Sequence, residues 1–169
     1  MEDNMNPNNK YFSITDYKSV EDYYDTKIEI DSREIAIDLN FETELTNRSE
    51  IDRVNKFIDS ISLHNCRNQN IIKEDFEKTV SMTSDYLGFY IEELEEEELA
   101  GIIDTSNKTI DKRLLLLEKL KLIRVGLYPQ ASYFATFDYS IEIDGEPCNQ
   151  LLVINTHENG TLDYITWES

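Results

Sequence analysis

The sequence is poor in the residues that build metal-held or disulfide-held scaffolds. Its 169 residues include two cysteines, two histidines, three prolines and five glycines. Two cysteines can neither frame a disulfide-rich fold nor fill a four-cysteine zinc site. The five glycines, Gly88, Gly101, Gly126, Gly145 and Gly160, are scattered, so there is no glycine-rich phosphate loop. We therefore expect no cofactor, no metal site and no standard nucleotide site.

Basic residues and long apolar runs are also scarce. Lys and Arg number 16 against 35 Asp and Glu, giving a net charge of −19. This charge opposes direct contact with a nucleic-acid backbone. No apolar run approaches the ~18 residues of a membrane-spanning helix, so we expect no membrane partner.

The start of the chain indicates the compartment. Met1 to Pro7 is polar and acidic and lacks the basic and apolar regions of a secretory signal, so we expect a cytoplasmic protein. Residues 1–10 are rich in Asn and Asp and are expected to be a disordered tail. Because 40% of the chain is hydrophobic and its length suits one domain, residues 11–169 are predicted to form a single globular domain.

Alternation of apolar and polar residues predicts strands at both ends of the sequence. Ile28 and Ile30, and then Ile35, Ile37 and Leu39, alternate around a short polar break at 31–33, as in a β-hairpin. Near the C-terminus, alternating segments at 123–127, 133–143, 151–156 and 162–167 are separated by turn residues, including two Asx-Gly dipeptides. These segments are typical of a four-stranded meander.

Helical spacing of apolar residues occupies the middle of the chain. It predicts one helix over 51–61, a longer one over 72–94 and a third over 108–120. The fold class is therefore α+β, with a mainly antiparallel sheet of about six strands and about three helices packed on one face. The expected core comprises Ile35, Ile37, Leu39, Phe76, Val80, Leu114, Phe137, Tyr139, Val153 and Ile165.

Catalytic patterns are weak. Cys148 and His157 would flank one predicted strand, and we interpret them as a turn cysteine and a loop histidine rather than a nucleophile and its base. Asp138, Glu142 and Asp144 alternate along one strand face and are interpreted as a solvated face. We therefore assign no catalytic residue and lean toward a protein that is not an enzyme.

The distribution of charge is the most informative feature. Residues 73–99 carry 10 acids and 2 bases, whereas 108–125 carry 6 bases and 2 acids. Paired against each other, these segments would contribute little stability, since exposed ion pairs are worth about 0–1 kcal/mol. Alternatively, the acidic surface steers a basic partner. The acids expected to bind it end the predicted long helix: Glu92, Glu93, Glu95, Glu96, Glu97 and Glu98.

Tyrosines form a second group of candidate binding residues. Tyr17, Tyr23 and Tyr24 lie among acids just before the first predicted hairpin. Tyrosine beside carboxylates suits a binding surface for Arg-rich and Lys-rich partners. The alternative is that these rings only cover one edge of the sheet.

Two segments carry a resemblance to known proteins. Residues 25–41, DTKIEIDSREIAIDLNF, and residues 159–169, NGTLDYITWES, resemble the leading and closing hairpins of an uncharacterised bacterial family of small acidic α+β proteins. The resemblance implies a bacterial, cytoplasmic, single-domain protein, and it implies no activity and no site residues.

These observations lead to two functional hypotheses. The first is a non-enzymatic acidic protein-binding module, such as an immunity-type inhibitor or regulator of a basic partner. The alternative is an enzyme or small-ligand-binding domain whose carboxylate- and tyrosine-lined pocket forms only in three dimensions.

Overall fold

The fold was obtained as a computed structural model that describes residues 10–12, 14, 17–45 and 48–169. The expected disordered tail, residues 1–10, lies outside this part except for Lys10, whose ammonium pairs with Asp59 at 2.5 Å. The elements of the N-terminal half are η1 (Tyr17–Ser19), β1 (Tyr23–Ile30), β2 (Arg33–Asn40), α1 (Ser49–Asp59), α2 (Ile61–Phe76), α3 (Met82–Glu93) and α4 (Glu96–Ile102). Those that follow are α5 (Lys112–Leu117), β3 (Lys121–Leu127), β4 (Ala135–Ser140), β5 (Glu142–Ile143), β6 (Glu146–Pro147), β7 (Leu151–Thr156) and β8 (Leu162–Glu168).

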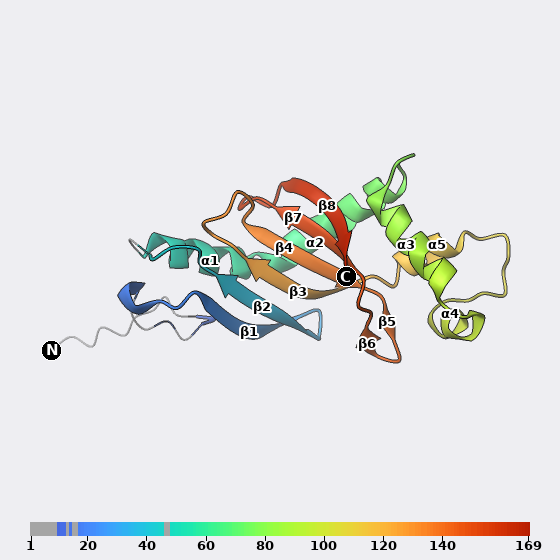
Figure 1. The fold of residues 1–169 in the computed structure, drawn as a ribbon, viewed down its shortest axis with the longest axis horizontal. Coiled ribbons are helices and arrows are strands. Elements are labelled where there is room, and N and C mark those ends of the chain that lie inside the picture. Colours follow the sequence, from blue (N-terminus) through green and yellow to red (C-terminus); the bar gives the residue numbers. More distant parts are fainter. Residues whose placement is uncertain (1–9, 13, 15–16, 46–47) are drawn as a thin grey trace.

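Six strands form one sheet in the order β1-β2-β3-β4-β7-β8 (Figure 1). The N-terminal hairpin joins the C-terminal strands, as the sequence predicts. The junction differs from the expectation, because β2 pairs with β3 in parallel, with Ile37 opposite Val125. The sheet is therefore mixed rather than purely antiparallel, and the chain crosses over from β2 to β3 through all five α-helices.

The first hairpin has the turn that its sequence predicts. Asp31 and Ser32 both have positive φ angles, 49° and 62°, and Ile30 pairs with Arg33 across the turn. A two-residue turn with both central residues in the left-handed region matches the right-handed twist of the strands. This register puts Ile35, Ile37 and Leu39 into the core, where all three are buried.

The alternation in β3 is shifted by a bulge. The register with β4 slips between Leu122 and Arg124, so that Leu122 and Val125 are both buried while Ile123 is only partly so. An extra residue in one strand moves the following side chains to the opposite face. As a result, Arg124 points away from the core.

The helices number five in the described residues, more than the three that the sequence predicts. Figure 1 shows α1 and α2 behind the sheet, with α3, α4 and α5 grouped beyond one end of it. Helix α1 buries Val54, Phe57 and Ile58, and Phe57 packs on Phe137 of β4. None of the described helices combines the length and apolar character needed to cross a bilayer.

The predicted long helix over 72–94 is interrupted, and polar capping explains the break. Helix α2 ends at Phe76, and α3 starts at Met82 with Ser81 as its N-cap. The Ser81 hydroxyl accepts a hydrogen bond from the Ser84 N–H at 2.9 Å, and the Asp75 carboxylate accepts one from the Thr83 N–H at 2.9 Å. The first N–H groups of α3 therefore gain partners that a continuous helix would not require.

Replacing Asp75 by Asn is expected to destabilise the protein by about 1–2 kcal/mol at neutral pH. Burial raises the pKa of Asp75, but hydrogen bonds from Thr83 and Ser81 outweigh it and hold the pKa below its ordinary value. This contribution is present above the unfolded-state pKa and is lost as the pH falls through the lower folded-state pKa. Urea unfolding should show that the difference in free energy of unfolding between the variant and the wild type is smaller at acidic pH than at neutral pH. Asp85→Asn, at an exposed position of α3, is the matched control; an equal loss there would contradict the cap.

The core matches the sequence-based expectation in the strands and departs from it in the helices. Phe137 and Tyr139 are buried in the core, and Phe76 and Ile165 pack against it while partly exposed. Val153 is also buried, but it lies on the other face of the sheet, beside Asp138. Two predicted core residues are wrong: Val80 is 86% exposed and Leu114 is 46% exposed. Val80 lies in the break between α2 and α3, where the helical periodicity that predicted its burial does not hold.

Candidate functional site

The face of the sheet opposite α1 and α2, here called the open face, carries most of the polar strand residues. Strand register aligns its side chains in two rows across the sheet. One row is Lys27, Ala36, Arg124, Asp138, Val153 and Thr166, and the other is Asp25, Asp38, Gly126, Thr136, Asn155 and Tyr164. In Figure 1 the part of the chain that the structure describes places no helix over this face.

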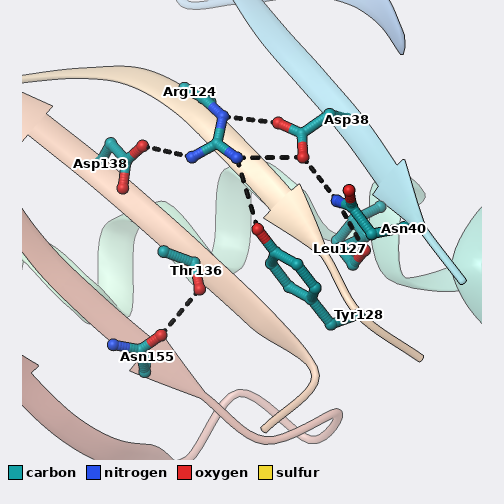
Figure 2. A network of polar contacts seen from close by, with 8 residues as sticks. All are labelled: Asp38, Asn40, Arg124, Leu127, Tyr128, Thr136, Asp138 and Asn155. Carbon is teal, nitrogen blue, oxygen red and sulfur yellow. Dashed lines mark hydrogen bonds and ion pairs between the residues drawn. The ribbon is translucent and has the colours of Figure 1, made fainter. Parts of the chain in front are cut away.

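Arg124 is the centre of a polar network on the open face (Figure 2). Its Nε and Nη2 donate to the two carboxylate oxygens of Asp38 at 2.5 and 3.0 Å, and its Nη1 donates to Asp138 at 2.6 Å. The guanidinium thus bridges β2 and β4 from the strand between them. Its fork geometry suits this bidentate pairing.

Burial and charge act against each other in this network. Burial would lower the pKa of Arg124, but the hydrogen bonds to Asp38 and Asp138 outweigh it and raise that pKa above its ordinary value. Burial raises the pKa of Asp138, and Arg124 offsets only part of the rise. The side chain of Asp138 is 5% exposed, against 37% for Arg124. The expected solvated face is therefore wrong at Asp138, which is buried by its neighbours on the sheet.

Gly126 lets an aromatic ring approach the network. A Cβ at this position would lie 2.9 Å from Cε2 and 3.1 Å from the hydroxyl of Tyr128, and 3.0 Å from Nη2 of Arg124. These distances are shorter than ordinary van der Waals contact, so a larger residue would displace the ring. Without a Cβ, Tyr128 folds back over β3 toward Arg124.

Tyr128 belongs to a tyrosine cluster, defined here as Tyr128, Tyr133 and Tyr164. The Tyr128 and Tyr133 rings meet edge-on with centroids 5.4 Å apart. Burial raises the pKa of Tyr133, and four neighbouring groups raise it further: Tyr128, Tyr164, Glu42 and Glu168. Tyr164 is 46% exposed. The cluster therefore places phenol groups and carboxylates at one accessible surface.

The open face is acidic as a whole. On its strands, six carboxylates (Asp25, Glu29, Glu34, Asp38, Asp138 and Glu168) face three cations (Lys27, Lys121 and Arg124), a net charge of −3. Lys27 pairs with Glu34 at 2.6 Å, and Arg124 is held by its two aspartates. The remaining carboxylates are available to a cationic partner.

The acidic residues predicted as a binding surface lie elsewhere in the structure. Glu92 and Glu93 end α3, Leu94 is extended, and Glu95 is the N-cap of α4. The Glu95 N–H donates to the Glu98 carboxylate at 3.0 Å in a capping box. Acids in the first turn complement the helix dipole, so Glu95, Glu96, Glu97 and Glu98 have a structural role at this helix start.

The predicted tyrosines are not brought to these acids. Tyr23 is exposed and Tyr24 half-buried at the start of β1, and Figure 1 places that end of the sheet far from α4. Tyr24 points to the covered face, where its ring meets Phe12 edge-on at 6.3 Å, whereas Tyr23 shares the open face with Asp25. Tyr17 lies in η1, and its side chain is outside the described part.

The weaker sequence candidates do not assemble into a reactive group. Cys148 precedes β7 and His157 follows it, so the two lie at opposite ends of that strand. His157 faces Asp163 at 3.7 Å. Within the described ranges, no group of three or more His, Cys, Asp and Glu residues is placed to hold a metal ion.

Sequence reasoning missed Arg124, Asp38 and the tyrosine cluster. Arg124 belongs to the basic segment 108–125 and to the predicted strand 123–127, and it lies in β3 as that strand prediction requires. The sequence feature that could have revealed the network is a cation at a polar position of one predicted strand. Asp38 and Asp138 occupy polar positions of two other predicted strands. Comparison of the chain with protein-family models, curated proteins and solved structures finds no significant match. The bacterial family resemblance of the two hairpins stays a prediction.

Proposed function

We propose that the chain is a non-enzymatic protein-binding module that receives a basic partner on the open face of its sheet. The observation that supports this most is the tyrosine cluster beside carboxylates on a face without a covering helix. Tyrosine supplies contact area at low entropic cost, and Arg or Lys side chains stack on its ring. The Arg124 network holds the centre of this face rigid.

Recognition would combine long-range and short-range forces. The net charge of −19 attracts a basic protein from a distance and raises its association rate, an effect that salt screens. At contact, the tyrosine cluster and the unpaired acids of the open face would engage apolar and cationic groups. An immunity-type inhibitor or a regulator of a basic protein is the form that such a module would take.

The proposal is tested by exchanging tyrosines of the open face. The immobilised chain is used to isolate a basic protein from native lysate at low salt, and affinity is then measured with purified components. Tyr133→Ser combined with Tyr164→Ser should weaken binding about tenfold or more. The matched control is Glu95→Gln, Glu96→Gln, Glu97→Gln and Glu98→Gln on α4, which should slow association at low salt and leave the dissociation rate unchanged.

Two outcomes would contradict the proposal. Binding that survives the tyrosine substitutions but is lost with the four glutamines would move the docking surface to α4. Retention of no protein, together with a small molecule that raises the melting temperature, would favour the alternative of an enzyme or ligand-binding domain. Circular dichroism of each variant establishes that it is folded.

A further inference from the structure

A hollow of about 440 Å³ lies between α1, α2 and the turn that joins β7 to β8. Its polar lining includes Arg53, Lys56, His64, Arg67, Glu158 and Asn159. This volume is within the usual range of small-molecule sites. The hollow is formed by the two helices and the turn, and it is separate from the strand residues that form the open face.

The hollow is positively charged in a chain that is otherwise acidic. Three cations line it against one carboxylate, a local charge of +2 where the whole chain carries −19. Arg53 forms an ion pair with Glu158, because its Nε and Nη2 donate to that carboxylate at 3.0 and 2.7 Å. Arg67 donates from Nη1 to the Asn159 carbonyl at 3.2 Å, which leaves most of its donors free. Within the described part, no ion pair engages the ammonium of Lys56.

His64 supplies a buried polar atom without a partner. The residue is 5% exposed, its ring stacks on Phe57 with centroids 4.3 Å apart, and its Nδ1 has no hydrogen-bond partner among the described residues. Burial lowers the pKa of His64 and the charge of Arg67 lowers it further, and both effects favour the neutral form of the ring. Leaving such an atom unsatisfied costs about 1–3 kcal/mol, and native proteins rarely do so without a reason.

Gly160 lets the β7–β8 turn pack directly against the His64 ring. A Cβ there would overlap Nδ1 of His64 and would lie 3.1 Å from Nη1 of Arg67. The missing side chain thus lets the turn approach Nδ1 of His64 and Nη1 of Arg67, which lie on the same side of Gly160. A neutral imidazole can donate from Nδ1, and a guanidinium always donates.

We propose that this hollow binds the phosphate or carboxylate group of a small ligand, with Arg67 and Lys56 supplying charge and His64 Nδ1 donating a hydrogen bond. Oxygen anions match these donors, because charge-assisted hydrogen bonds from guanidinium to such groups are short and strong. The acidity of the remaining surface repels long polyanions, which limits the ligand to a small molecule. The site goes beyond the proposed protein-binding function and does not depend on it.

The test titrates the whole chain with inorganic phosphate and, separately, with succinate at constant ionic strength. Either probe should raise the melting temperature in a saturable way and shift the ring resonances of His64. The chain has two histidines, so a His157→Gln variant assigns the signals. A response to phosphate alone indicates a phosphate-bearing ligand, and a response to succinate alone indicates a carboxylate-bearing one. If neither probe gives a saturable response, the proposal is wrong.

Variants separate this site from general charge effects. Arg67→Gln and Lys56→Gln should each weaken binding about tenfold, the loss of one charge-assisted interaction. His64→Phe retains the ring stack on Phe57 and should also weaken binding. Lys119→Gln, which removes an exposed cation outside the hollow, should leave the affinity unchanged. Equal weakening in Lys119→Gln, or unchanged binding in Arg67→Gln, would overturn the assignment.

Discussion

Replacing Arg124 by methionine is expected to lower the free energy of unfolding by about 3 kcal/mol at neutral pH. The substitution keeps an unbranched side chain of similar reach and removes the cation that Asp38 and Asp138 share. Both carboxylates would then stay buried without a charge partner. The guanidinium is 37% exposed, so water partly replaces it, and the loss should fall below that of a fully buried pair.

The pH dependence and a double variant test this explanation. Without Arg124, the pKa of Asp138, already raised by burial, should rise further, so that the native state binds a proton more readily than the unfolded state. Stability is then regained as the pH falls through that raised pKa, and the deficit against wild type narrows in acid. Adding Asp138→Asn to Arg124→Met should restore about 1–2 kcal/mol. Urea unfolding gives all four corners of the cycle, and a strictly additive result would contradict the coupling.

Replacing Gly160 by alanine is expected to cost about 2–4 kcal/mol. Gly160 has a φ of 81°, in the left-handed region, where a side chain adds about 1 kcal/mol of strain. The new Cβ would also overlap the ring of His64, which Phe57 holds from behind. Displacing a ring packed in this way costs about 1–3 kcal/mol more.

The chain contains a matched control for this substitution. Gly145 has a φ of 84°, and nothing lies within 4 Å of a Cβ built on it. Gly145→Ala should therefore show the backbone strain alone, about 1 kcal/mol. Thermal unfolding of the two variants isolates the contact with His64 as their difference. Equal losses of stability in the two variants would show that the His64 ring moves aside without an energetic cost.

The strands could be predicted from the sequence because each alternating pattern is local. Ile35, Ile37 and Leu39 needed only their own spacing and the turn before them, and they are buried as expected. The parallel pairing of β2 with β3 could not be predicted in this way. This pairing brings Asp38 and Arg124 together, although the five helices separate them along the chain. A short-range sequence pattern does not indicate which strands become neighbours.

The helices were harder because apolar spacing continued through a break. Ile72, Phe76 and Val80 fit one stripe, yet α2 ends at Phe76. The overlooked signal was Ser81, a typical N-cap residue. Its hydroxyl accepts a hydrogen bond from the N–H of Ser84, three positions later. The run Glu95 to Glu98, predicted to end the long helix, begins α4 instead, and its role as a binding surface stays a prediction.

The two proposed sites differ in what the sequence could reveal. An acidic binding protein was expected from composition, although the surface now proposed uses Tyr128, Tyr133 and Tyr164 rather than the predicted residues. The hollow at His64 was not anticipated. Its cations are spread over α1 and α2, and only the packing of the β7–β8 turn gathers them around one space.

The parallel junction between β2 and β3 has a consequence for the order of folding. The C-terminal strands β3, β4, β7 and β8 follow one another closely along the chain, whereas the segment that holds all five α-helices separates β2 from β3. Pairs that are distant along the chain bear a high loop-closure entropy and form slowly. During synthesis the β1–β2 hairpin leaves the ribosome first, with the edge of β2 unpaired. The open edge of a completed hairpin is thus the surface that the nascent chain must protect from aggregation until β3 arrives.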